Sequence, residues 1–142
     1  MTNYLSEHFT LEEMTKSETA RKYRIDNTPP ESAIKNLKIL CTQVLEPARA
    51  KFGLPLVVSS GYRCIKLNRL VGGVANSYHT KGMAADLLLQ DFKKANRLAE
   101  LLNQQQLCDI VLLEHSRNGG QWLHVQFSHN PRHRINLNFL AE

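Results

Sequence analysis

The order of hydrophobic and polar residues predicts a helical first half of the chain. A capping box at residues 10–13 predicts a short helix that begins just after Thr10. Residues 23–30 form a predicted loop that ends in two prolines, which can open a helix. Apolar residues then recur at helical spacing over residues 31–52, and Gly53 ends the pattern. Pro47 predicts a kink in this helix, because proline removes a backbone hydrogen bond.

The second half of the chain favours strands. Short runs rich in β-formers predict strands over residues 56–60, 83–89, 109–114, 122–127 and 134–140. A loop rich in turn residues separates the first two strands, and Asp91 predicts the start of a helix whose apolar face is Phe92, Ala95, Leu98, Ala99 and Leu102. The last strand alternates as an edge strand does. Helices followed by clustered strands predict a single α+β domain over residues 1–142, with N-terminal helices packed on a small antiparallel sheet.

Composition narrows the class of protein without identifying a function. The chain has 42% hydrophobic and 22% charged residues, which is typical of a globular protein and excludes disordered and fibrous classes. No apolar run approaches the ~20 residues of a membrane helix, so no membrane span is expected. The first residues carry no basic region followed by an apolar stretch, so no signal peptide is visible. We therefore expect synthesis in the cytoplasm.

Charge and cysteine usage exclude two further kinds of site. The net charge is +5, but the 18 basic residues are spread along the chain and cluster only at residues 131–134. Without a nucleic-acid motif, we expect no nucleic-acid partner. The three cysteines form no CxxC pair, so we expect buried free thiols in place of a zinc ribbon or a disulfide framework. The expected oligomeric state is a monomer.

Strand alternation brings three polar residues toward one place. Asp86 and His124 lie in predicted strands and can face the same pocket, and His79 comes from the loop just before the first of these strands. Gly82 lets that loop turn back sharply without a Cβ clash. Two imidazoles and one carboxylate suit Zn²⁺ and leave a fourth position for water. Alternatively, Asp86 accepts hydrogen bonds in a turn and the histidines are ordinary polar residues. Spacing alone leaves both interpretations open.

A wider set of motifs resembles a known enzyme family. The matching elements are Ser60-Gly-Tyr-Arg63, Asn68, Gly72-Gly73, Ser77-x-His79-x-x-Gly82-x-Ala84-x-Asp86 and Trp122-x-His124. In this order they resemble the zinc D-alanyl-D-alanine carboxypeptidases and dipeptidases, the LAS metallopeptidases, which include phage endolysins. The resemblance implies a LAS/Hedgehog-like fold and one Zn²⁺ per chain, held by His79, Asp86 and His124. It also implies that Arg63 faces the reacting carbonyl and that Ser77 lies in the substrate cleft.

The same resemblance implies a reaction and a substrate. We expect a zinc-activated water to attack a peptide carbonyl in peptidoglycan stem peptides, with zinc and the Arg63 guanidinium stabilising the developing charge. A basic chain also suits an anionic cell wall. The resemblance implies the periplasm or cell wall as the site of action, reached by a route other than a visible signal peptide. The sequence leaves carboxypeptidase and endopeptidase action open, because loops decide whether the cleft is closed beyond the scissile bond.

The group that moves the proton is the point where the chain departs from the family. Family members often place an acid or a histidine three positions before the last zinc histidine, but here that position is Gln121, which cannot act as a base at neutral pH. We predict Glu114 as the catalytic acid–base residue. His115 is next to it but faces the opposite way on alternation, and Asp109 lies at the far end of the strand. Gln121 also keeps a second function open: an inactive zinc-binding module that recognises or supports the cell wall.

Overall fold

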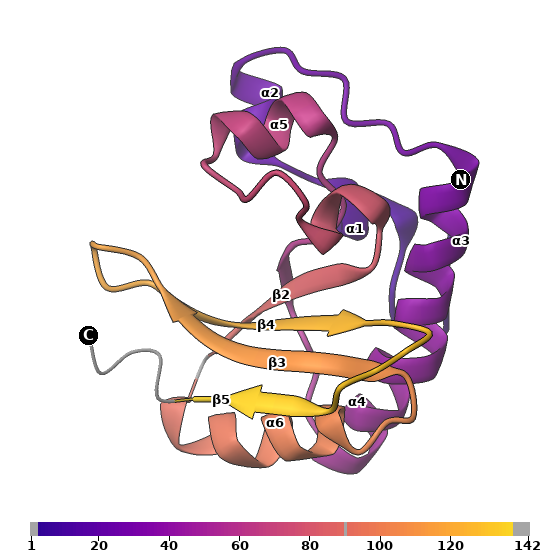
Figure 1. The fold of residues 1–142 in the computed structure, drawn as a ribbon, viewed down its shortest axis with the longest axis vertical. Coiled ribbons are helices and arrows are strands. Elements are labelled where there is room, and N and C mark those ends of the chain that lie inside the picture. The colour runs from indigo at the N-terminus through magenta and orange to yellow at the C-terminus, as the bar shows by residue number, and fades with distance from the viewer. Residues whose placement is uncertain (1–2, 90, 138–142) are drawn as a thin grey trace.

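The computed structural model describes residues 3–89 and 91–137, and its elements run from short N-terminal helices to a five-stranded sheet (Figure 1). Helix α1 (Leu11–Thr15) confirms the predicted capping box, because the Thr10 hydroxyl accepts from the Glu13 N–H and Glu13 accepts from the Thr10 N–H. Helix α2 (Glu18–Lys22) was not predicted. Its five residues are too few for a periodic pattern, and the Ser17 hydroxyl that caps it is the main local signal.

The long predicted helix is present but is divided by a widened turn. It consists of α3 (Glu31–Leu40), the π-helical segment η1 (Cys41–Leu45) and α4 (Glu46–Phe52). Proline inside an α-helix clashes with the carbonyl four residues earlier and donates no hydrogen bond. The chain resolves this problem just before Pro47, where the Glu46 N–H reaches back five residues to the Cys41 carbonyl. Gly53 ends α4 with a φ of +79°.

The sheet has the order β1-β2-β4-β3-β5. Its strands are β1 (Val58–Ser60), β2 (Ala84–Leu88), β3 (Cys108–His115), β4 (Gln121–Phe127) and β5 (Arg134–Asn136). The first four pair antiparallel, as predicted, but β5 pairs parallel to β3. The predicted antiparallel sheet is therefore confirmed for four strands, and β5 is the exception. Because β4 already has a neighbour on each side, the chain reverses after β4 and joins the free edge of β3, which gives a parallel pair. Residues 138–140 of the predicted last strand lie outside the described residues.

One face of the sheet carries the hydrophobic core. Its inward side chains pack with apolar residues of α3, η1 and α6 (Ala95–Asn103); they are Ala85, Leu87, Val111, Leu113, Leu123, Val125 and Phe127. Asp91 caps the 3-10 turn η3 (Phe92–Lys94) that leads into α6, because its carboxylate accepts from the Lys93 N–H. The helices before a small, mostly antiparallel sheet confirm the predicted α+β class. No helix within residues 3–89 and 91–137 has the length and apolar character of a membrane span.

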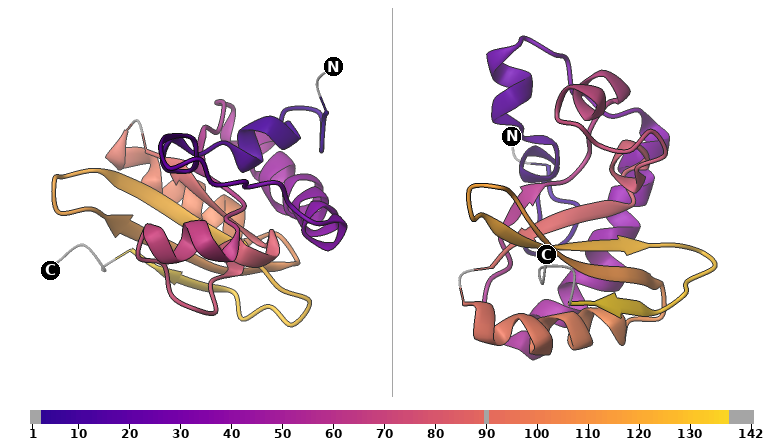
Figure 2. Two further views of the ribbon diagram at one scale, coloured as in Figure 1. Left: turned by 90° about the horizontal axis from the view of Figure 1, so that it is seen from above. Right: turned by 60° about the vertical axis from the view of Figure 1, so that its left-hand side comes forward.

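The segment between β1 and β2 contributes to the end of the molecule that lies away from α6. The predicted loop contains α5 (Ile65–Leu70) and the 3-10 turn η2 (Tyr78–Lys81). Helix α5 lies with α1 and α2 at the end of the molecule away from α6 (Figures 1 and 2). The Cys64 thiol caps α5, since its sulfur accepts from the Leu67 N–H. All three cysteines are free thiols as predicted, but Cys64 is half-buried, whereas Cys41 and Cys108 are buried. Between this segment and the sheet face opposite the core lies an open cleft.

Candidate metal centre

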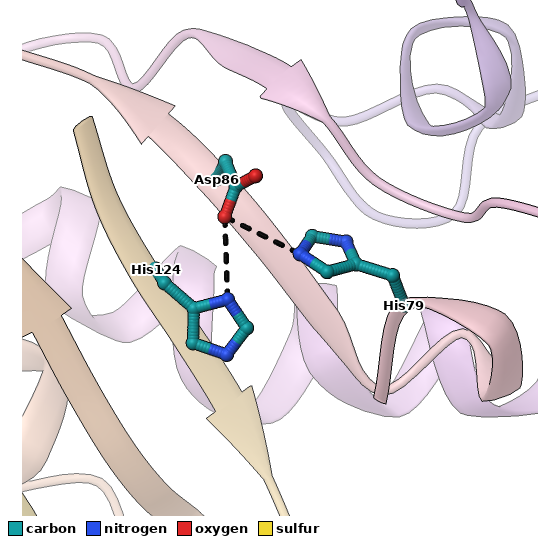
Figure 3. A group of neighbouring side chains, drawn as sticks. All are labelled: His79, Asp86 and His124. Atoms are coloured by element: carbon teal, nitrogen blue, oxygen red, sulfur yellow. Dashed lines mark hydrogen bonds and ion pairs between the residues drawn. The ribbon is translucent and has the colours of Figure 1, made fainter. Parts of the chain in front are cut away.

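Three polar side chains from different elements meet on the sheet face opposite the core. Asp86 on β2 lies directly opposite His124 on β4 in the strand register, and His79 comes from η2 (Figure 3). Asp86 Oδ1 is 3.3 Å from His79 Nε2 and 3.3 Å from His124 Nδ1. One ligand atom from each residue lies within 4.8 Å of the other two, and all three residues are buried. The predicted cluster is therefore present. Because Asp86 lies inside a strand, the alternative that it accepts hydrogen bonds in a turn is wrong.

Local structure around η2 fixes the position of His79. The Ser77 hydroxyl accepts from the His79 N–H at 3.2 Å, and Gly82 ends the turn with a φ of +74°. The His79 Nδ1 donates to the Gly61 carbonyl at 2.7 Å, because that oxygen can only accept. The Nε2 nitrogen of His79 is therefore the one without a proton, and it points at Asp86.

The electrostatics of the cluster favour an anionic Asp86 beside two imidazoles. Burial by itself raises the pKa of Asp86, but hydrogen bonds to His124 and His79 outweigh it and hold this pKa below its ordinary value. Burial works to lower the pKa of His124, but the hydrogen bond and charge of Asp86 raise it overall. The site thus attracts positive charge.

The geometry of the three side chains fits a zinc ion. Ligands bound tetrahedrally at about 2.0–2.1 Å from zinc are about 3.3 Å from each other. Both nitrogen–oxygen distances in the cluster are 3.3 Å, which is longer than most hydrogen bonds between such groups. His79 directs its unprotonated Nε2 to this point, as a neutral zinc ligand must, and His124 directs its Nδ1 there. The three residues match a site with three protein ligands and an open fourth position.

A cleft of about 490 Å³ opens over the cluster, and Arg63 stands at its edge. The Arg63 backbone N–H donates to the His79 carbonyl at 3.1 Å, which ties this residue to the ligand turn. Burial lowers the pKa of Arg63, and the charges of Asp86 and Glu114 oppose that change without cancelling it. Within the described part of the chain, the buried Arg63 Nε has no hydrogen-bond partner. The guanidinium therefore has an unused donor beside the cluster.

Glu114 lies in the same cleft, and Gln121 does not. Glu114 and Trp122 are opposite each other in the register of β3 and β4, and the Trp122 Nε1–H donates to Glu114 Oε1 at 2.8 Å. Gln121 is exposed at the start of β4 and is not among the residues that line the cleft. His115 also lines the cleft, although alternation assigns its side chain to the face opposite to that of Glu114. It lies at the end of β3, where strict alternation no longer decides a side chain's surroundings.

Ser77 and the glycine pair form another wall of the cleft. Ser77 is buried, and it both caps η2 and lines the cleft. Asn68 donates from Nδ2 to the Val74 carbonyl at 2.8 Å, and a Cβ on Gly73 would lie 2.0 Å from the Asn68 Oδ1. The absence of a side chain at Gly73 therefore lets Asn68 fold this loop back toward the metal ligands.

A second layer of polar residues behind His124 was not predicted. Gln126 contacts His124, Asp109 contacts Gln126, and Arg132 contacts Asp109. Alternation along the strand places Gln126 on the same face as His124, and this was the sequence signal from which their contact could have been predicted. As expected, Asp109 is not among the residues that line the cleft.

Comparison with known proteins supports a common origin for this arrangement. Residues 7–126 match the family described as Peptidase M15, so the match includes all three residues of the cluster. No curated protein matches the chain.

Proposed function

The chain belongs to the peptidase M15 family, and from this membership and the buried cluster we propose a zinc-dependent peptidase acting on peptidoglycan stem peptides. The observation that carries the proposal is the convergence of His79 Nε2, Asp86 Oδ1 and His124 Nδ1 at the floor of an open cleft. When bound there, zinc would polarise the carbonyl of the scissile bond and lower the pKa of the attacking water to about 7. Stabilisation of the carbonyl oxygen and transfer of the proton are then the tasks of the protein's own side chains.

Arg63 is the residue we assign to the developing negative charge of the carbonyl oxygen. Its guanidinium lies at the cleft, where partial burial strengthens electrostatic interactions. Its buried Nε lacks a partner among the described residues, and the side chain lines the cleft in which a substrate carbonyl would lie. Preorganised donors of this kind typically contribute about 10²–10³-fold to the rate of acyl transfer.

Glu114 is the residue we assign to proton transfer. The Trp122 indole holds one carboxylate oxygen at 2.8 Å, so the position of the carboxylate is fixed before substrate binds. The charge of Glu114 acts on both Arg63 and His124, which supports a location beside the reacting atoms. We propose that it takes the proton of the attacking water and returns it to the leaving amine.

The space around Arg63 favours cleavage within a peptide over removal of a terminal residue. A second hollow of about 450 Å³ shares Arg63 and Val71 with the cleft and continues past them to Lys16 and Glu18. A substrate can therefore extend on both sides of Arg63. We propose endopeptidase action on stem peptides, with Ser77 contacting the substrate on the metal side.

The other candidate function is an inactive zinc-binding module for cell-wall recognition. Gln121 was the feature that favoured it, since glutamine cannot move the proton. In the structure Gln121 is outside the cleft and a carboxylate lies inside it. This arrangement supports the hydrolase.

The deciding experiment is digestion of purified peptidoglycan and of isolated stem peptides by zinc-loaded protein, with mass spectrometry of the products. A peptidase releases new amines from internal bonds, and a chelator abolishes the release until zinc is restored. An excess of free D-alanine would instead indicate carboxypeptidase action. Stoichiometric zinc with wall binding but without any cleavage would establish the recognition module and refute the enzyme.

A further inference from the structure

A chain of buried polar contacts runs from His124 away from the cleft. Gln126 Oε1 is 2.7 Å from His124 Nε2, on the side of the imidazole opposite to Asp86. The Gln126 Nε2 donates to Asp109 Oδ2 at 2.9 Å. Gln126 and Asp109 are both buried, and Gln126 also borders the cleft. The hydrogen-bonding state of Asp109 at one end of this series of contacts therefore constrains that of His124 at the other end.

Arg132 fixes the chemical state of Asp109 at the outer end. It donates from its backbone N–H at 2.8 Å and from Nε at 3.0 Å to Oδ1, and from Nη2 at 2.8 Å to Oδ2. The hydrogen bond from Arg132 is the main cause that lowers the pKa of Asp109 to about 2. At neutral pH this side chain is a carboxylate, which only accepts hydrogen bonds.

An acceptor at Asp109 determines the orientation of the next two groups. Gln126 has to turn its NH₂ group toward Asp109, so its carbonyl oxygen faces His124. That oxygen needs a donor, so His124 Nε2 carries the proton. A neutral imidazole has one N–H, which leaves Nδ1 with a free lone pair directed at Asp86.

We propose that Asp109 and Gln126 are positioning residues that set the tautomer of His124, so that Nδ1 is its metal-binding nitrogen. This inference rests on the zinc site proposed above. The two histidine ligands then use different nitrogens, because the Gly61 carbonyl fixes His79 with Nε2 free. A backbone carbonyl sets the tautomer of His79, whereas side chains set the tautomer of His124. Because side chains can be substituted, the proposal can be tested at His124.

The substitution Asp109→Asn reverses the chain of hydrogen bonds. The new amide keeps its oxygen toward the Arg132 backbone N–H and Nε, because both of these donors stay at that position, whereas at the Oδ2 position only Arg132 Nη2 remains a donor once Gln126 rotates. Its NH₂ group then faces Gln126, which has to rotate and present its own NH₂ group to His124. The His124 Nε2 becomes an acceptor, the proton moves to Nδ1, and the metal-binding nitrogen is blocked. We expect zinc affinity to fall about 10- to 100-fold, as for other outer-shell partners of metal ligands.

A compensating variant separates this role from simple packing. In the double variant Asp109→Asn/Gln126→Glu, the carboxylate introduced at position 126 accepts both from the amide introduced at position 109 and from His124 Nε2, so the original tautomer returns. The total charge is also unchanged. We expect the double variant to regain most of the lost zinc affinity. Asp26→Asn, the same chemical change at a carboxylate whose hydrogen bonds lie outside the cluster, is the control and keeps the wild-type affinity.

Two measurements test the inference independently of peptidase activity. Competition with a chromophoric chelator gives the zinc affinity, and ¹⁵N NMR of the metal-free protein at alkaline pH identifies the protonated nitrogen of His124. Movement of the proton to Nδ1 in Asp109→Asn, and its return in the double variant, would support the inference. An unchanged tautomer, or a double variant as weak as the single one, would overturn it.

Two further outcomes keep the test decisive. If Asp109→Asn does not fold, Gln126→Met removes the acceptor of His124 with similar side-chain volume, and wild-type zinc affinity in that variant would overturn the inference. If the wild-type protein binds zinc but cleaves no peptide, the proposed function fails while the NMR result still judges the tautomer.

Discussion

Gly82 is the position where the fold most directly constrains the metal centre. It ends η2 three residues after His79, with a φ of +74°, and a Cβ built there would lie 2.5 Å from the Ala33 carbonyl oxygen of α3. The Asn36 side chain also donates to the Lys81 carbonyl at 2.9 Å, so the turn is held against the helix. The substitution Gly82→Ala therefore has to push η2 away from α3.

The size of the effect follows from two separate terms. An alanine in a left-handed conformation costs about 1–2 kcal/mol, and overpacking against an immobile backbone adds about 1–3 kcal/mol. Gly53→Ala is the matched control, because Gly53 has a φ of +79° and nothing lies within 4 Å of its Cβ position. Both substitutions also reduce the entropy of the unfolded chain by similar amounts, so that term cancels. The difference between the two variants isolates the contact with Ala33.

Urea unfolding of the zinc-free proteins measures this difference. We expect Gly82→Ala to lose about 2 kcal/mol more than Gly53→Ala, which corresponds to an additional fall of about 4–8 °C in Tm for a chain of this size. Because the displaced turn carries His79, zinc affinity should also fall in Gly82→Ala and remain unchanged in Gly53→Ala. Equal destabilisation of the two variants, with equal zinc affinity, would refute the idea that α3 holds the ligand turn in place.

Three other predictions concern the site and its support. His79→Ala removes one of three ligands, so zinc should no longer copurify at one ion per chain, and chelation should no longer lower Tm as it does for the wild-type protein; metal analysis and thermal unfolding check both. Glu114→Gln keeps an acceptor for Trp122 but cannot take a proton, so kcat should fall about 10²–10⁴-fold with zinc content unchanged. The control Gln121→Ala should keep the wild-type kcat. A normal rate in Glu114→Gln would assign proton transfer to another residue. The hydrogen bond from Arg132 lowers the pKa of Asp109 from 3.8 to about 2, so this carboxylate stabilises the fold fully above pH 4 and loses its contribution as the pH falls toward 2. The gap in unfolding free energy between wild-type protein and Asp109→Asn should therefore shrink by about 2 kcal/mol over that range, and a gap independent of pH would contradict the assignment.

The sequence by itself determined the features that depend on local spacing. Alternation along two strands put Asp86 and His124 on one face, and the strand register pairs them directly. The capping box, the glycine at the end of η2 and the long amphipathic helix were equally visible, because each depends on residues a few positions apart. The motif order was enough to indicate the family that the match over residues 7–126 establishes.

Only the tertiary structure decided which distant groups serve the cluster. Glu114 was predicted from the sequence as the catalytic acid–base residue, but its entry into the cleft depends on the register in which β3 lies beside β4. Arg132 reaches Asp109 across 23 positions, and the parallel pairing of β5 depends on which sheet edge is free. Short-range periodicity specifies which face of an element is polar, but contacts between elements depend on how whole faces pack. That packing energy is summed over many residues, so no single motif reveals it.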